Sequence, residues 1–196
     1  MSAAATRLQI VEAADRLFYE QGFEATAFAN IAAATGLSRG NFYYHFKAKD
    51  EILDAVITLR LERTSLLLEG WQAAAEAPGE RIRSFIGMLI GNRAKIMLYG
   101  CPVGTLCAEL AKLDHIANSR ASELFTLFRA WLAGQFALLG RTSDADALAM
   151  HLLMRSQGVA TLAAAFRDEA FIRREVSEMN TWLEAQSPPA PFPPAN

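Results

Sequence analysis

The sequence predicts an all-α fold, with a small N-terminal domain of three short helices followed by a larger helical domain. Three observations predict this class. Apolar residues recur every three to four positions, and no long run alternates with the two-residue period of a strand. Glycine, serine, threonine and proline interrupt these runs where helix caps and turns are needed. The 196 residues are 52% hydrophobic and 20% charged, enough for a substantial core.

The first fifty residues contain three predicted helices. An apolar stripe marks one face of the first helix: Ile10, Ala14, Leu17 and Phe18. Gly22 is expected to end that helix. Thr26 is expected to be the N-cap of a second helix, "AFANIAAAT", because its hydroxyl can accept a backbone N–H that is otherwise unpaired. Gly36 ends the second helix, and Ser38 is expected to cap a third.

The rest of the chain is predicted to form longer helices. One begins at Lys49 and runs to about residue 77, before the break at Pro78 and Gly79. Further helices are expected at about 80–97, 105–114, 117–139, 144–167 and 169–185. Five prolines in the last ten residues predict a disordered tail over 187–196. The predicted domains are therefore 1–48 and 49–186, followed by that tail.

Charge is segregated within the N-terminal region. A net charge of −2 argues against a protein that is basic throughout, so any affinity for nucleic acid must come from a local patch. Residues 1–50 carry five basic and five acidic residues, yet no acidic residue lies between Ala25 and Lys49. The segment that contains the second and third helices is therefore the candidate patch.

No targeting segment or cofactor motif stands out. The N-terminus lacks the unbroken apolar core of a signal peptide. The uncharged runs, 96–108 among them, are all shorter than the roughly 18 apolar residues that a membrane span needs. Two cysteines give no disulfide framework, and three scattered histidines show no metal-ligand spacing. We expect a cytoplasmic protein with reduced thiols, no membrane partner, no metal and no cofactor.

The stretch "FANIAAATGLSRGNF" has the spacing of a helix-turn-helix. Ala32 is small enough to let two helices cross closely, and Gly36 can adopt the left-handed backbone that a tight turn needs. Leu37 and Phe42, with Ile31, would fill a small core against the first helix. The alternative interpretation is a helical hairpin with a solvated basic edge.

The third helix is predicted to enter the major groove of double-stranded DNA, with base-reading side chains on its outer face and phosphate contacts at its end. Gly40 lets the backbone approach the groove closely, and N–H groups opening the next helix add an anion site. The predicted DNA-binding residues are Thr26, Ser38, Arg39, Gly40, Asn41, Tyr43, Tyr44, His45, Lys47 and Lys49.

At these residues the sequence resembles a known family. "GFEATAFANIAAATGLSRGNFYYHFKAKDEIL" is similar to the N-terminal signature of the tetracycline-repressor (TetR) family of one-component bacterial regulators, over roughly residues 7–54. The resemblance implies an all-helical homodimer with a three-helix DNA-binding domain on a larger ligand-binding domain. It also implies that Tyr44 and Lys49 hold phosphates, that Arg39, Asn41 and Tyr43 read bases, and that the last two long helices dimerise.

The larger domain offers candidates for a small-molecule site of unknown specificity. "YGCPVGTLCAEL" is expected to be a loop followed by a short helix capped by Thr105, with Cys101 and Cys107 either reactive or ligand-adjacent thiols or small buried hydrophobes. The segment is similar to a "GC-P/L-x-G" segment of a subset of this family, some of whose members sense reactive electrophiles or small unsaturated compounds. Aromatic and sulfur side chains that can line an apolar pocket, or can be plain core, are Trp71, Phe85, Met88, Phe125, Phe128 and Trp131.

Two further groups of residues lie in the last two predicted helices. His151 and Arg155 are one turn apart and can meet an anionic effector, a dimer contact or solvent. A four-helix interface between two chains is expected to use small and apolar residues of these helices, with an intrachain role as the alternative. The predicted dimerisation residues are Gly158, Leu162, Ile172, Val176, Met179, Trp182 and Leu183.

The sequence favours a ligand-controlled transcriptional repressor that binds a palindromic operator as a homodimer. Three alternative functions are compatible with parts of the sequence. One is an electrophile sensor that acts through Cys101 on the same scaffold. Another is an enzyme, which no nucleophile elbow, phosphate loop or catalytic cluster supports. The last is a helical interaction protein without DNA binding, which leaves the acid-free segment unexplained.

Overall fold

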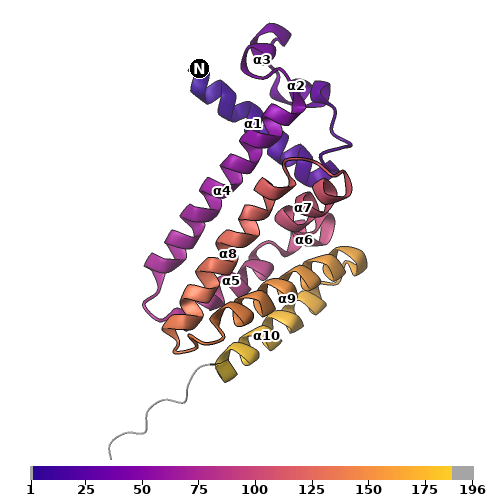
Figure 1. Cartoon of the computed structure of the whole chain (residues 1–196). Coiled ribbons are helices and arrows are strands. Elements are labelled where there is room, and N and C mark those ends of the chain that lie inside the picture. The colour runs from indigo at the N-terminus through magenta and orange to yellow at the C-terminus, as the bar shows by residue number, and fades with distance from the viewer. Residues whose placement is uncertain (1, 187–196) are drawn as a thin grey trace, which may run out of the picture. The chain divides into compact units, whose positions relative to one another are not determined.

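The computed structural model of the chain describes residues 2–186 (Figure 1). Every regular element within those residues is an α-helix, so the all-α prediction is confirmed. The helices are α1 (Ala3–Gln21), α2 (Phe28–Thr35), α3 (Arg39–His45), α4 (Lys49–Ala74), α5 (Pro78–Gly91), α6 (Arg93–Tyr99), α7 (Pro102–Lys112), α8 (Asn118–Leu138), α9 (Ala145–Phe166) and α10 (Glu169–Gln186). The predicted disordered tail lies outside the described residues.

The chain divides into two compact units. The first comprises residues 1–66 and 99–126, and the second comprises 67–98 and 127–196. Helices α4 and α8 each contribute to both units. This division by packing differs from the predicted functional boundary between residues 48 and 49, because α7 and the start of α8 pack into the same core as α1 to α3. The functional boundary itself stays a prediction.

Local chemistry sets the ends of the first three helices. Ser2 caps α1 by accepting a hydrogen bond from the Ala5 N–H at 3.2 Å. Gly22 ends α1 with a φ of +92°, and Gly36 ends α2 in the left-handed region at +66°. Both glycines were predicted to end helices, and side chains at such φ values would strain the backbone. These two turns fix where α2 and α3 begin.

The predicted capping role of Thr26 is wrong. The N-cap of α2 is Ala27, which provides no side-chain hydrogen bond. Thr26 is fully buried, and its hydroxyl donates to the carbonyl oxygen of Gly22 at 2.6 Å. The hydroxyl therefore closes the turn that follows α1, which a threonine achieves as readily as a cap. Because Thr26 has no exposed side-chain surface, the predicted contact of its side chain with DNA is also wrong.

The core of the first unit joins the three short helices to α4, α7 and α8. Phe42 and Phe46 are fully buried, and the Phe42 ring meets Phe28 edge-on with centroids 5.1 Å apart. The other buried members are Ile10, Val11, Ala14, Phe18, Phe23, Ile31, Ile52, Leu53, Ala55, Val56, Ile57, Leu106, Leu110 and Ala121. The predicted packing of the second and third helices on the first is confirmed at Ile31 and Phe42.

Two of the later helices differ from their predicted bounds. The segment predicted as one helix over 80–97 is broken at Asn92, whose side-chain amide donates to the Met88 carbonyl oxygen at 3.0 Å. Helix α7 begins at Pro102 with Cys101 as its N-cap, so the predicted cap at Thr105 is wrong. The Thr105 hydroxyl instead donates to the Cys101 carbonyl oxygen at 2.8 Å. The Asn92 and Thr105 side chains thus both bond to a backbone carbonyl one turn before them.

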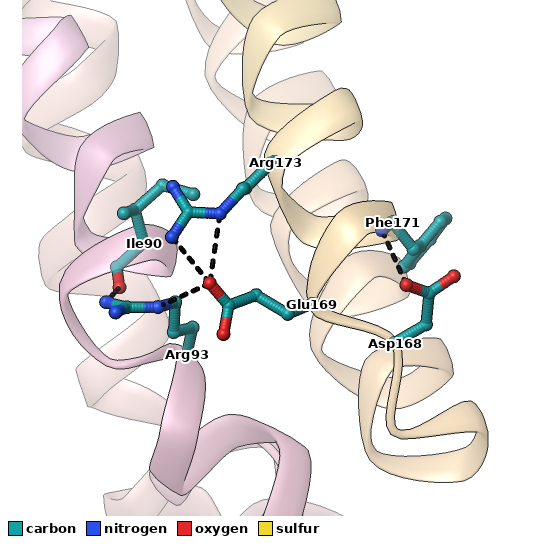
Figure 2. Close-up of polar contacts among 6 residues, drawn as sticks. All are labelled: Ile90, Arg93, Asp168, Glu169, Phe171 and Arg173. Atoms are coloured by element: carbon teal, nitrogen blue, oxygen red, sulfur yellow. Dashed lines mark hydrogen bonds and ion pairs between the residues drawn. The ribbon is translucent and has the colours of Figure 1, made fainter.

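An ion-pair network joins the start of α6 to the start of α10 in the second unit. Figure 2 shows Arg93 and Arg173 approaching the same carboxylate oxygen of Glu169. The Arg93 Nε to Glu169 Oε1 distance is 3.0 Å, and Arg93 Nη1 also donates to the Ile90 carbonyl oxygen at 3.0 Å. Hydrogen bonds from Arg173 and then Arg93 lower the pKa of Glu169. This network holds the α5–α6 break against α10.

Candidate nucleic-acid interface

Helix α3 presents a polar, aromatic outer face. Ser38 is the N-cap, as predicted, and its hydroxyl oxygen accepts the Asn41 N–H at 3.4 Å. Phe42 is the buried anchor, so the neighbouring side chains are directed away from the core. The exposed residues of this face are Arg39, Gly40, Asn41, Tyr43 and Tyr44. These residues include the entire predicted base-reading set.

Aromatic contacts order this face. The Arg39 guanidinium lies over the Tyr43 ring, 5.8 Å from its centroid, which restricts both side chains. Tyr44 is 73% exposed, and its ring lies edge-on to His45 with centroids 5.1 Å apart. Tyr44 thus offers a phenol hydroxyl to solvent at the end of α3. Phenol hydroxyls and imidazole N–H groups are suitable donors to phosphate oxygens.

The two lysines predicted to hold phosphates are bonded within the chain. The Lys47 ammonium donates to the Tyr43 carbonyl oxygen at the end of α3, and the Lys47 backbone N–H donates to Glu51. The Lys49 ammonium donates to the Phe23 carbonyl oxygen at 2.9 Å and lies 4.2 Å from the centroid of the Phe23 ring. Lys49 therefore supports the turn between α1 and α2, whatever further contact it makes to DNA.

Sequence reasoning missed Arg7. This exposed residue of α1 lies over the ring of Phe46, with 4.7 Å between its guanidinium carbon and the ring centroid. Phe46 is the C-cap residue of α3. The contact therefore places a cation from the first helix at the end of the third. Arg7 and Phe46 are far apart in the sequence, so helical periodicity does not indicate that they meet. Only the fold reveals the contact.

Sequence reasoning also missed Glu109 of α7. Its two carboxylate oxygens accept the backbone N–H groups of Phe23 and Glu24, at 2.8 and 2.9 Å. These partners lie 86 and 85 residues away along the chain. The carboxylate thus binds the turn that leads from α1 into the helix-turn-helix. No local motif predicts a contact of this separation.

The ten predicted ligand-binding residues are distributed over both units. Cys101, Cys107 and Phe125 belong to the first unit, and the other seven belong to the second. Within the second unit the Trp71 and Trp131 rings lie 5.6 Å apart, and those of Phe85 and Phe128 lie 5.7 Å apart. Phe85 and Phe128 are buried within a single chain, as is expected of pocket-lining residues and of core residues alike. A ligand-binding role for these residues stays a prediction.

His151 and Arg155 have partners within the second unit. The His151 ring stacks on Trp182, with centroids 4.5 Å apart, while its Nε2 atom is buried without a hydrogen-bond partner. Arg155 forms an ion pair with Glu175 at 3.1 Å, and both side chains are about three-quarters buried. The two residues therefore face α10 rather than open solvent. Any anion that binds Arg155 must compete with Glu175.

The two cysteines differ in their surroundings. The Cys101 sulfur accepts a hydrogen bond from the Gly104 N–H at 3.4 Å, at the first turn of α7. Burial raises the pKa of the Cys107 thiol, with a further increase from the neighbouring Cys101. Cys107 therefore has a smaller thiolate fraction at neutral pH than an ordinary cysteine.

The predicted dimerisation residues fall into two groups. Ile172, Met179 and Leu183 of α10 are buried in their own chain, with at most 1% exposure, so the prediction that they contact a partner is corrected. They pack inward because α10 lies against α5 and α9. Val176 and Trp182 are half-buried, whereas Gly158 and Leu162 of α9 are exposed. The alternative intrachain role therefore applies to the apolar stripe of α10.

Helix α9, unlike α10, carries an exposed row of apolar residues, which we call the apolar ridge. Four large hydrophobic residues and one glycine recur at four-residue intervals and are all exposed: Met150, Met154, Gly158, Leu162 and Phe166. Rows of this spacing form the ridges that pack into grooves of another helix. Gly158 has open space where a Cβ would lie, so a second helix can approach closely at the middle of the ridge.

Neither a metal-ligand cluster nor a membrane-spanning helix is found among the described residues. Within 2–186 no three His, Cys, Asp or Glu side chains are arranged to hold a metal ion. No helix among these residues is both long and apolar enough to cross a membrane. The concentration of exposed aromatic and polar groups on α3 is thus the main functional signal in the first unit.

These features define a helix-turn-helix protein: two short helices joined by a left-handed glycine, with a serine-capped second helix whose outer face is polar. The sequence model described as "Bacterial regulatory proteins, tetR family" matches residues 10–56, which include α2, α3 and the C-terminal part of α1. The helix-turn-helix region of this chain is therefore a TetR-family domain.

Comparisons with individual proteins agree with this assignment. An uncharacterised HTH-type transcriptional regulator in the lacX 3′ region of Lactococcus lactis subsp. lactis is 32% identical over 62% of this chain and 63% of its own length. The HTH-type transcriptional repressor DhaR of Mycobacterium sp. strain GP1 is 28% identical over 67% of this chain and 64% of its own length. The matches thus span less than two thirds of either relative.

The fold is also found among solved structures. A TetR transcriptional regulator from Chloroflexus aurantiacus superposes with a TM-score of 0.80, covering 93% of this chain and 96% of its own. The sequence identity is 22%, so this likeness concerns the fold alone. The predicted combination of an N-terminal helix-turn-helix with a larger helical part is confirmed.

Proposed function

We propose that this protein is a ligand-responsive transcriptional regulator of the cytoplasm, which binds a palindromic operator as a homodimer. The observation that carries the proposal is the outer face of α3, where Arg39, Asn41 and Tyr43 are exposed on a helix anchored by Phe42. An exposed helix of this kind fits the major groove of DNA. The acid-free segment around it avoids repulsion of phosphates.

The dimer is supported by the apolar ridge on α9. Exposed hydrophobic side chains at regular spacing are unusual on a monomer and typical of a self-complementary contact. A two-fold dimer would place two α3 helices on half-sites about 34 Å apart, one turn of DNA. A palindromic operator follows from that symmetry.

Control by a small molecule requires a second conformation. An effector that binds preferentially to a form with another spacing between the α3 helices weakens DNA binding by that difference in affinity. Repression, with release by the effector, is the mode we propose. The seven candidate ligand-binding residues of the second unit are where we expect that effector to bind.

The test is an unbiased selection of random duplex DNA by the purified full-length chain, with affinity measured at two salt concentrations. A palindromic consensus bound by two chains is the expected result. Failure to enrich any sequence, using protein refolded to remove bound small molecules, would contradict the proposal and favour an interaction protein without DNA binding.

Arg7→Ala is expected to weaken binding to all duplex sequences and to reduce the slope of log affinity against log salt by about one. The reason is that Arg7 lies beside the end of α3, where a phosphate passes. Arg16→Ala is the matched control, since Arg16 is exposed nine positions further along α1 and so projects from the opposite face. Equal effects of the two substitutions on the salt slope would exclude this role for Arg7.

A cysteine-based electrophile sensor on the same scaffold is a second candidate. It is favoured by the environment of Cys107, because burial, with a further contribution from Cys101, raises the pKa of the Cys107 thiol and lowers its reactivity. We expect one equivalent of iodoacetamide at neutral pH to modify Cys101 before Cys107, as read by mass spectrometry of peptides. Loss of operator affinity on modification, prevented by Cys101→Ser, would support sensing. Equal labelling of both cysteines, or unchanged operator affinity, would rule against it.

A further inference from the structure

The turn between α1 and α2 is bound by opposite charges from two other helices. Glu109 of α7 accepts the backbone N–H groups of Phe23 and Glu24. Lys49 of α4 donates to the carbonyl oxygens of the same two residues, at 2.9 and 3.4 Å. All four backbone groups of this dipeptide are therefore bonded to charged side chains. Hydrogen bonds of this kind are about twice as strong as those between neutral groups.

The fit between Glu109 and the turn is close. A Cβ atom at Gly22 would lie 3.0 Å from the nearer Glu109 carboxylate oxygen, and the φ of Gly22 is +92°. A side chain at residue 22 would thus strain the backbone and press on the carboxylate. Phe23 itself is buried and packs edge-on against Phe18, with ring centroids 5.3 Å apart. The turn has little freedom to move independently of α7.

Helix α7 is bonded to α1 at its other end as well. The Tyr19 hydroxyl donates to the Gly100 carbonyl oxygen at 2.9 Å, and burial raises the pKa of Tyr19 to about 12, so this group keeps its proton. Arg60 donates to the Pro102 carbonyl oxygen and to Asp15, both at 2.6 Å. These contacts join the start of α7 to the same helix whose end Glu109 binds.

We propose that Glu109 is a positioning residue for DNA recognition, through which α7 sets the direction in which α2 and α3 leave α1. The proposal rests on the proposed function. A displacement of α7 relative to α1 either carries the turn with it or gives up two charge-assisted hydrogen bonds. Helix α7 is therefore a coupling element in addition to α4, whose Lys49 binds the same turn.

The test compares Glu109→Ala with Glu123→Ala in the full-length protein. Glu123 is exposed on α8 in the same unit, so its substitution makes the same change in charge without touching the turn. Affinity is measured for the selected operator and for an unrelated duplex. Glu109→Ala should weaken operator binding about tenfold and leave binding to the unrelated duplex unchanged, because phosphate contacts alone support the latter. Simple unfolding would lower both affinities together.

Hydrogen exchange gives a readout that does not depend on DNA. The backbone amides of Phe23 and Glu24 should exchange faster in Glu109→Ala than in the wild type. In Glu123→Ala they should exchange at the wild-type rate. Glu109→Gln keeps one acceptor oxygen, so its amide exchange rates should lie between those of Glu109→Ala and Glu123→Ala. It serves as the test variant if Glu109→Ala does not fold. Operator affinity and exchange in the Glu109 variants equal to those of the control would overturn the proposal.

Failure of the proposal and failure of the proposed function are distinguishable. If the wild type selects no operator, the proposed function is contradicted, and the role of Glu109 in recognition is contradicted with it. If the wild type selects an operator and the Glu109 variants bind it normally despite faster exchange, only the positioning role is wrong. Reduced operator affinity with faster exchange supports both.

Discussion

Leu162→Asp is expected to convert the proposed dimer into a monomer and to weaken operator binding at least about hundredfold. Leu162 lies near the centre of the exposed apolar ridge on α9, next to Gly158 where helices can approach most closely. A carboxylate there would be desolvated without a partner in the contact between two chains. A monomer contacts only one half-site, so its affinity for the operator falls from the range of specific binding toward that of non-specific binding. Sedimentation velocity and operator titration measure the two effects.

The control for this substitution is Leu138→Asp. Leu138 is a leucine of the same unit, more exposed than Leu162 and outside the ridge. Leu138→Asp should leave both the mass of the protein in solution and its affinity for the operator unchanged. A dimer that persists in Leu162→Asp would show that the chains associate through another surface, and the ridge would need a different explanation.

Phe42→Ala is expected to lower the free energy of unfolding by about 3–5 kcal/mol, the usual cost of removing a fully buried phenylalanine ring. Phe42 is the anchor of α3, and its ring packs edge-on with those of Phe28 and Tyr43 in one cluster. A helix of seven residues is not stable by itself in water, so its order depends on that anchor. Urea denaturation followed by circular dichroism measures the loss.

Tyr44→Ala is the matched control on the same helix. This ring is 73% exposed, so its removal should change the free energy of unfolding by no more than about 0.5 kcal/mol. The same variant should nevertheless bind operator more weakly, because Tyr44 is a proposed phosphate contact. Equal destabilisation by the two substitutions would mean that α3 is not held by Phe42 as described.

The helix-turn-helix was predictable in detail because its determinants are local. Gly22, Gly36 and Ser38 act within one turn of their own positions, through backbone freedom or a short hydrogen bond. The apolar spacing around Phe42 is equally local. Helix order, the ends of α1 and α2 and the outer face of α3 therefore followed from residue types and spacing.

Capping assignments were less predictable because one side chain often has several nearby acceptors. Thr26 and Thr105 both donate to carbonyls four residues before them, where N-caps were expected. A threonine next to a turn satisfies either pattern, and both the buried Thr26 and the exposed Thr105 bond to the preceding turn. The break at Asn92 directly follows Gly91, and glycine is a common helix end that the prediction of one helix over 80–97 overlooked.

Local chemistry along the chain was sufficient to define the three short helices, the recognition face and the family. Tertiary packing decided which charged groups meet the turn after α1, and so assigned Lys49 and Glu109 to the backbone of Phe23 and Glu24. It also decided that the apolar stripe of α10 faces inward while a ridge on α9 stays exposed. Both outcomes depend on contacts between residues far apart in the sequence, and helical periodicity shows that a face is apolar without showing what covers it.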